Sequence, residues 1–435
     1  MSNGQCPIFV LQGPVGGFFG YLCSKLVASG YDVVKFQFNF ADQLLQRAPG
    51  AKCFRGDLAE WEQHLARLCI EKRPQAILFF GDRRPVHIVA CEVAEKYGIP
   101  AFSFEEGYLR PDFVTLEAEG NNARSPIMSQ PLVLPAEETA RRIRRVGRAF
   151  ERMAWGATLY FVVKHFGSGF YPFYKHHRER PLVVETLRWM RNLRRKVLLS
   201  RKDGALCRAM AKNHDRKFFV VALQVHDDLQ AVHHGCGWTQ ERLIEQAIAS
   251  FARHAPRETR LLIRHHPMDR GHRSYALLVA ETAATHGVGD RTSLLFNGSG
   301  PQLLEHAAGF ITVNSTMALS AMYHHCPVYA LGDAFYKIDG LVSPGVDEAG
   351  LDAFWTAPQP VDAALYRRFR EYLLQNSQIN GSYYLPGFYE GIVRAVLRRL
   401  AGEGIVPQRE RPAMVGSSSA VADFRGAAAA KAETP

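Results

Sequence analysis

Two adjacent histidines, His265 and His266, lead directly into Pro267 within IRHHPMDRG (263–271). Proline fixes its own φ and holds the residue before it in an extended conformation. A histidine held in this way can hydrogen-bond a phosphate or donate a proton to a leaving group. Arg270, three residues after the proline, adds positive charge. The segment therefore predicts a site that binds a phosphate.

A pair of carboxylates, Asp227 and Asp228, stands in ALQVHDDLQ (222–230) between Gln224 and Gln230. A carboxylate in this position can act as a nucleophile or as a base. The alternative is structural, because Asp is also favoured at the start of a helix. The residues alone leave both interpretations open.

Another charged cluster contains Glu105, Glu106 and Arg110, within FSFEEGYLRPDFVTLE (102–117). Polar groups crowded at the end of a strand are candidates for general acid or base catalysis. The alternative here is a loop stabilised by salt bridges.

Two further turns have the composition of anion sites. Glycines allow the backbone to approach a ligand closely before a helix N-terminus, and hydroxyl and amide side chains suit a phosphate or a nucleoside. The residues concerned are Gly16 and Gly17 in LQGPVGGFFG (11–20), and Asn314, Ser315 and Thr316 in TVNSTMALSA (312–321). Each turn taken alone also fits an ordinary connection or helix cap.

Short apolar runs typical of buried strands must position these residues, and they alternate with helical patterns in two blocks. The expected strands are 8–12, 33–38, 76–80 and 101–105 in the first block, and 218–224, 261–266, 293–297, 309–314 and 328–332 in the second. This alternation predicts an α/β fold with two Rossmann-like domains and parallel sheets. Ligands bind at the carboxyl ends of such strands, where every cluster above falls.

Length and composition agree with a soluble globular chain. The 435 residues allow two to four domains, and 47% are hydrophobic and 22% charged. The longest apolar run, near 154–163, is too short to span a bilayer. The N-terminus lacks the basic residues of a secretory signal, and the eight cysteines are scattered, as in a reduced cytoplasmic protein. No motif predicts a metal site.

Positive charge is concentrated in residues 141–217, which hold 21 Lys or Arg and only 5 Asp or Glu, whereas the whole chain has a net charge of +11. Aromatic residues are interleaved with the basic ones. This mixture suits either nucleic acid or an anionic membrane surface. The apolar stretch AWGATLYFVV (154–163) favours the membrane, because it is too apolar for a nucleic-acid strip. A solvated helical face remains the alternative.

Taken in order, the motifs resemble the capsule polysaccharide biosynthesis and export family of Gram-negative bacteria. They are LQGPVGGFF, EEGYLRPDFVTLE, LQVHDDLQ, RHHPMDRG, and NSTMALSA followed by PVYALGDAFYKIDGL. The resemblance covers about residues 8–345. Within this family, the chain is similar in particular to the single-module members that add 3-deoxy-manno-octulosonic acid (Kdo) to a lipid.

The resemblance implies a GT-B-like fold and a retaining β-Kdo glycosyltransferase. Its donor is expected to be CMP-β-Kdo, without a cofactor or metal, and its acceptor a phosphatidylglycerol or lyso-phosphatidylglycerol. The product would start the poly-Kdo linker of a capsule. We expect a cytoplasmic protein, peripheral on the inner face of the inner membrane, that works with a second Kdo transferase and the capsule export machinery and binds no nucleic acid.

The resemblance also assigns roles within the cleft expected between the domains. Asp228 is the expected nucleophile of a double displacement, because the family motif matches Gln224-x-x-x-Asp228-x-Gln230. His266, in the family's His-Pro motif, would assist CMP departure, and Glu106 would activate the acceptor. The expected substrate-binding residues are Gly16, Gly17, Glu105, Arg110, Gln224, Gln230, His265, Pro267, Arg270, Asn314, Ser315 and Thr316. The choices between Asp227 and Asp228, and between Glu105 and Glu106, stay open.

The expected organisation has five parts: an acceptor domain (1–135), a basic-aromatic helical segment at the membrane (136–216), a CMP-sugar domain (217–345), C-terminal helices (346–402) and a disordered tail (403–435). Three other functions are alternatives. They are a GT-B transferase or epimerase that uses another nucleotide sugar, a membrane-docked export component without catalysis, and a nucleic-acid-binding protein. Fold alone does not decide among them.

Overall fold

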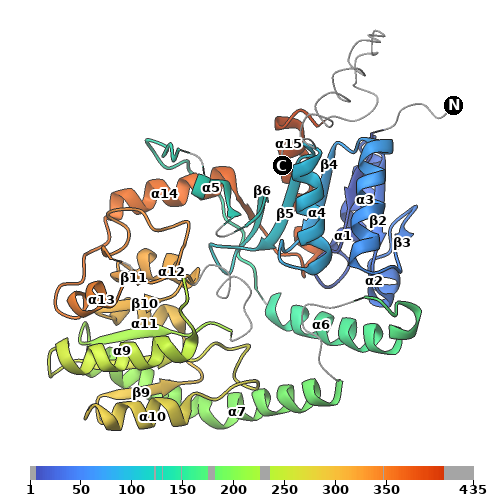
Figure 1. Ribbon diagram of the computed structural model, residues 1–435. Coiled ribbons are helices and arrows are strands. Elements are labelled where there is room, and N and C mark those ends of the chain that lie inside the picture. Colours follow the sequence, from blue (N-terminus) through green and yellow to red (C-terminus); the bar gives the residue numbers. More distant parts are fainter. Residues whose placement is uncertain are drawn as a thin grey trace, which may run out of the picture.

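The structure, a computed structural model, describes residues 6–121, 124–129, 131–147, 149–174, 182–225, 236–345 and 347–405. It contains two sheets flanked by helices (Figure 1). Every strand expected from the apolar runs is present. The α/β fold with two parallel-dominated sheets is therefore confirmed.

The first sheet has seven strands in the order β12-β6-β5-β4-β1-β2-β3. Its parallel part consists of β1 (Ile8–Val10), β2 (Val33–Gln37), β3 (Lys52–Cys53), β4 (Ala76–Phe80) and β5 (Ala101–Glu106). Antiparallel strands β6 (Phe113–Ala118) and β12 (Gln378–Asn380) extend it at one edge. The associated helices are α1 (Phe18–Ala28), α2 (Phe40–Leu45), α3 (Leu58–Lys72), α4 (Pro85–Lys96) and α15 (Pro386–Gly402).

The second sheet has five parallel strands in the order β11-β10-β7-β8-β9. They are β7 (Phe218–Ala222), β8 (Arg260–Arg264), β9 (Thr292–Leu295), β10 (Gly309–Thr312) and β11 (Val328–Ala330). The helices of this half are α9 (Gln240–His254), α10 (Ala276–Thr285), α11 (Gly300–His306), α12 (Met317–Tyr323), α13 (Glu348–Phe354) and α14 (Ala363–Asn376). In the sequence, strands β6 and β7 are separated by α5 (Pro126–Ser129), α6 (Ala149–Phe166), the 3₁₀ turn η2 (Ser168–Phe170) and α7 (Leu182–Asn213).

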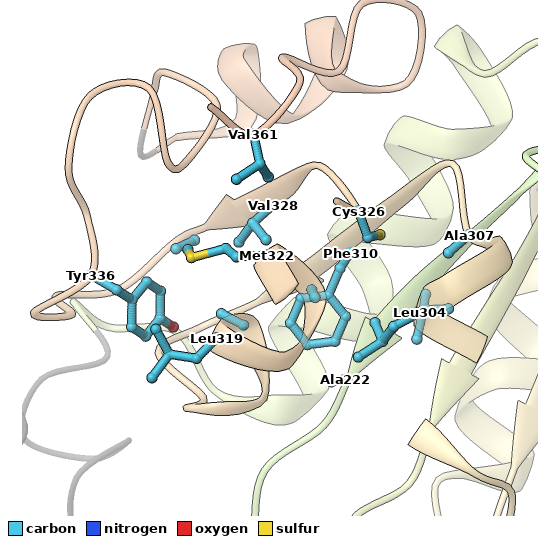
Figure 2. Close-up of a cluster of buried hydrophobic side chains, with 14 of the residues drawn as sticks. Ala222, Leu304, Ala307, Phe310, Leu319, Met322, Cys326, Val328, Tyr336 and Val361 are labelled. Carbon is cyan, nitrogen blue, oxygen red and sulfur yellow. The ribbon is translucent and has the colours of Figure 1, made fainter. Parts of the chain in front are cut away.

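Alternate residues of the central strands pack on opposite faces of each sheet, because side chains alternate along a strand. In β1, Ile8 and Val10 join a core with α1 and α15, whereas Phe9 joins a core with α3 and α4. The second sheet is likewise covered on both faces. Figure 2 shows part of one of its cores, around Phe310 and Met322. Burial on both faces explains why these strands are continuous apolar runs.

The chain returns to the first half after completing the second. Helix α14 packs in a core of the second half, whereas β12 pairs with β6 and α15 packs in a core of the first. Ile405 is buried there, and its carbonyl accepts a hydrogen bond from the Tyr31 hydroxyl at 3.0 Å. The rest of the predicted tail lies outside the described residues. Two Rossmann-like halves with this return make the fold GT-B-like.

Both sheets have the same topology. Their parallel strands follow the order 3-2-1-4-5 when they are numbered within each half. This order changes direction between β1 and β4 in the first sheet, and between β7 and β10 in the second. Ligands of open α/β sheets bind at such switch points, at the carboxyl ends of the strands. The fold therefore marks two places where functional residues should gather.

A buried polar network attaches α6 to the first half. The Asp42 carboxylate is fully buried and accepts hydrogen bonds from the Gln12 amide at 2.7 Å and the Tyr160 hydroxyl of α6 at 2.8 Å. Asn39 also donates to it, at 3.2 Å. A buried carboxylate is stable only when it is hydrogen-bonded in this way.

Asp42→Asn should lower the free energy of unfolding by about 2–4 kcal/mol. The substitution replaces one carboxylate oxygen, an acceptor, with an amide NH2 group, a donor, while the surrounding Gln12, Asn39 and Tyr160 groups still donate hydrogen bonds. Chemical denaturation of the full chain measures this change. The control is Asp57→Asn, at the exposed N-cap of α3, where Asn is as good a cap as Asp. Equal effects of the two substitutions would contradict the role given to Asp42.

Candidate active site

Gln224 and Asn314 meet at the switch point of the second sheet, since they follow β7 and β10. The Gln224 amide donates to Asn314 Oδ1 at 2.9 Å, and the Asn314 backbone N–H donates to Gln224 Oε1 at 3.2 Å. The Gln224 backbone N–H donates to Gln240 Oε1 at 2.7 Å. These bonds fix both amide side chains at the place where the fold expects a ligand.

His266 follows β8, the strand beside β7, and is half-buried. It therefore stands in one row with Gln224 and Asn314 along the carboxyl ends of β8, β7 and β10. The backbone N–H of Met268 donates to His266 Nδ1 at 3.2 Å. Because Nδ1 is an acceptor, a neutral His266 carries its proton on Nε2. Nε2–H is thus a donor suited to a phosphate oxygen. The structure therefore brings His266, Gln224 and Asn314 together along one edge of the second sheet.

The other predicted residues of this loop hold its shape. His265 is buried and stacks on Phe296 with ring centroids 5.1 Å apart, and burial lowers its pKa. The Arg270 guanidinium donates to the Pro267 carbonyl at 3.0 Å and also to Asn297 Oδ1. Both side chains thus fix the turn that carries His266. Their direct contact with substrate stays a prediction.

Ser315 and Thr316 form the turn between β10 and α12. The Ser315 hydroxyl accepts from the Met317 backbone N–H at 3.2 Å, and its carbonyl accepts from the Tyr336 hydroxyl at 2.9 Å. Thr316 precedes α12, and its side chain makes no capping hydrogen bond. Both residues are half-buried beside Asn314. Asp227, Asp228 and Gln230 lie outside the described residues.

At the first switch point, the predicted glycines form the turn between β1 and α1. Gly16 has a φ of +102°, a conformation that favours glycine, and Gly17 is exposed. A side chain at Gly13 would place its Cβ 2.4 Å from the Phe19 ring. The Arg84 guanidinium, after β4, donates to the Gly13 carbonyl at 3.1 Å. This bond joins the two loops on either side of the switch point.

Glu105 and Glu106 end β5, next to β4. Burial raises the pKa of the Glu105 carboxyl to about 7, although the Glu106 backbone N–H donates to Glu105 Oε1 at 3.0 Å. Glu106 accepts a hydrogen bond from the Tyr384 hydroxyl. Burial and the nearby Glu106 charge raise the Tyr384 pKa. Arg110 is exposed, and its Nε donates to the Gly107 carbonyl at 3.2 Å.

The family model "Capsule polysaccharide biosynthesis protein" matches residues 75–384. The chain belongs to this family. It is 34% identical to the capsule polysaccharide export protein KpsS of Escherichia coli, over 86% of this chain and 96% of the relative. It is 33% identical to the capsule polysaccharide modification protein LipB of Neisseria meningitidis serogroup B, over 88% of this chain and 92% of the relative.

Among solved structures, the beta Kdo 2,7 transferase KpsC of Thermosulfurimonas dismutans aligns with 85% of this chain and 100% of that chain. The TM-score is 0.38 and the sequence identity is 12%. The resemblance stated from the motifs is confirmed at the level of the family.

Two further residues of the candidate sites had no role assigned from the sequence, and the first is Arg264, which stands in the motif IRHHPMDRG (263–271). Arg264, the last residue of β8, points its Nη1 at the Met317 sulfur, 3.6 Å away at the start of α12. Its Nε is buried without a hydrogen-bond partner, and no ion pair with a carboxylate is found for it within the described ranges. Burial, followed by the nearby Arg270 charge, lowers its pKa. A phosphate at the switch point would carry a counter-charge for this guanidinium.

Tyr384 is the second such residue. It follows β12, 278 residues after Glu106, and only the return of the chain brings the two together. Tyr384 belongs to no distinguishing motif, so no local pattern indicates its role. Arg264, in contrast, stands at the strand end directly before the two histidines, so the motif already contained it.

Across residues 6–405, apart from the gaps given above, no helix is long and apolar enough to cross a membrane. In the same ranges, no group of three or more His, Cys, Asp or Glu side chains could hold a metal ion.

Proposed function

We propose that this member of the capsule family is a retaining β-Kdo glycosyltransferase. It moves Kdo from CMP-β-Kdo to phosphatidylglycerol or lyso-phosphatidylglycerol and so starts the poly-Kdo linker of a capsule. Membership of the family supports the link to capsule synthesis. The observation that carries the donor assignment is the row of Asn314, Gln224 and His266 at the second switch point, with Arg264 and its buried Nε beside it.

This row matches the chemistry of a nucleoside monophosphate ester. His266 Nε2–H and the Arg264 guanidinium are donors for one phosphate group. Gln224 and Asn314 offer amide groups of the kind that recognise a base or a ribose. The first half offers carboxylates instead, at the end of β5, and these suit a hydroxyl that must lose a proton.

In the proposed reaction, an Asp228 carboxylate oxygen attacks the anomeric carbon of Kdo. The bond from that carbon to the phosphate oxygen breaks, its electron pair goes to CMP, and His266 stabilises the departing phosphate. The acceptor hydroxyl then gives its proton to Glu106, and its oxygen displaces Asp228 from the anomeric carbon. Two inversions at one carbon give net retention.

The proposed place of reaction is the cytoplasmic face of the inner membrane, where the lipid acceptor is found. There the enzyme would act before or beside a second Kdo transferase and the capsule export machinery. Nucleic acid has no part in this proposal.

Calorimetric binding of CMP, UMP, UDP and GDP to the full chain tests the donor assignment. We expect CMP to bind best and Gln224→Leu to weaken CMP binding about five- to tenfold, because it removes both hydrogen bonds to Asn314. Gln375→Leu, on the exposed side of α14, is the control. Preference for UDP would favour a transferase or epimerase with another nucleotide sugar. Absence of nucleotide binding would favour an export component without catalysis.

A further inference from the structure

Helix α6 presents a stripe of apolar side chains to solvent. Trp155 and Phe166 are each 78% exposed, and Leu159 is 53% exposed. They are spaced by four and seven residues, so they lie on one face of the helix. Large apolar side chains gathered on one exposed face in this way are unusual for a surface that meets only water.

Helix α7 presents a second exposed face, in which apolar and basic residues alternate. Leu187, Met190 and Val197 are between 60% and 64% exposed. The exposed Arg194 and Arg201 lie among them. Along its 32 residues, α7 has nine Lys or Arg and two acidic residues.

The opposite faces of both helices are attached to the candidate site. On α6, the Tyr160 hydroxyl donates to Asp42 and accepts from Asn39 at 2.7 Å. Asp42 also holds Gln12, which leads into the glycine turn. On α7, the Asn192 amide donates to the Pro267 carbonyl at 3.1 Å. Each exposed stripe is thus the outer side of a helix whose inner side supports one half of the site.

The two helices lie on the same side of the molecule. In Figure 1 both helices run along the lower side of the molecule, α6 under the first sheet and α7 under the second half. Both exposed stripes belong to the segment with the large excess of positive charge.

We propose that the exposed faces of α6 and α7 form one docking surface for a bilayer that contains anionic phospholipid. This inference rests on the proposed site of reaction at the membrane. Apolar side chains would enter the boundary between headgroups and acyl chains, while Arg194 and Arg201 meet the lipid phosphates. A bilayer is favoured over nucleic acid because the exposed Leu187, Met190 and Val197 of α7 are aliphatic and cannot stack on bases.

The hydrogen bonds of Tyr160 to Asp42 and of Asn192 to Pro267 give this surface a role in the reaction. The bilayer would meet α6 beside the glycine turn of the first half, and α7 beside the turn that carries His266. An acceptor lipid would therefore start next to both halves of the site rather than diffuse to it through water.

Flotation of the full chain with vesicles tests the inference. The probes are vesicles of phosphatidylethanolamine and phosphatidylglycerol, and vesicles of phosphatidylcholine alone. We expect binding to the first at least about tenfold stronger than to the second, since each basic residue near an anionic surface contributes to binding. Equal binding to both, or no binding to either, would overturn the proposal.

Variants locate the surface. Trp155→Glu with Phe166→Glu, and separately Leu187→Glu with Val197→Glu, should each weaken vesicle binding at least about tenfold. The matched controls are Ile70→Glu on α3 and Leu277→Glu on α10, which are 61% and 69% exposed. Thermal unfolding shows whether each variant is folded. Equal losses in controls and test variants would overturn the assignment to α6 and α7.

The two proposals can fail separately. Flotation uses no CMP-Kdo, whereas transfer to a detergent-dispersed acceptor uses no vesicles. Vesicle binding without transfer would support the docking surface and contradict the enzyme assignment. Salt-dependent retention of duplex DNA without vesicle binding would overturn the docking surface in favour of a nucleic-acid partner.

Discussion

Asp228→Ala is expected to lower the rate of Kdo transfer at least about a thousandfold and to leave the affinity for CMP within about twofold. Without its nucleophile the enzyme cannot form the covalent intermediate of a double displacement. Any remaining rate then comes from the groups that still bind the substrate. CMP binding should persist, because the proposed phosphate donors belong to His266 and Arg264. Initial rates with CMP-Kdo, together with CMP titration, measure both quantities.

Asp227→Ala is the matched control, since it changes the neighbouring carboxylate in the same segment. We expect it to retain most of the transfer rate. A thousandfold loss in Asp227→Ala with normal turnover in Asp228→Ala would move the nucleophile to the other residue. Normal turnover in both variants would contradict a nucleophile in this segment.

Glu106→Gln is expected to lower kcat about a hundred- to ten-thousandfold, because an amide cannot accept the proton of the acceptor hydroxyl. Tyr384 holds Glu106 in place, so Tyr384→Phe should cause a smaller loss than Glu106→Gln. Tyr372→Phe, on α14, is the control for a Tyr-to-Phe change. Steady-state kinetics with saturating donor measure these effects.

The pH profile separates Glu106 from Glu105. A carboxyl acts as a base only when it is ionised, and the pKa of Glu105 is raised by burial to about 7. If Glu105 were the base, kcat would rise with pH up to about 7, and Glu105→Gln would abolish that rise together with activity. We expect instead that Glu105→Gln retains activity and that Glu106→Gln does not. The reverse result would exchange their roles.

The central strands could be predicted from sequence because burial on both faces makes them continuous apolar runs. Strand β12 could not, since it has three residues and pairs with β6 more than 250 positions earlier. Its position depends on α14 and α15 packing on different halves of the molecule. The bond from Tyr384 to Glu106 depends on that return, so no local pattern indicates it.

The candidate site was predictable in part. His266, Gln224 and Asn314 follow apolar runs, and parallel pairing alone is enough to align them at one edge. The roles of His265 and Arg270 in fixing the turn depend on side-chain packing against Phe296 and Asn297, which the motif does not specify. Likewise, composition indicated a basic-aromatic segment, but only the structure separates the inner faces of α6 and α7 from the exposed ones.

A single transfer assay tests the central claim most directly. The full chain would be incubated with CMP-Kdo and a fluorescent lyso-phosphatidylglycerol in detergent, and the mass of the lipid product measured. The proposed function predicts a product heavier by one or more Kdo residues, which Asp228→Ala fails to form. An unchanged lipid mass, with the protein folded and CMP bound, would contradict the assignment of this acceptor. An unchanged mass without CMP binding would contradict the donor as well.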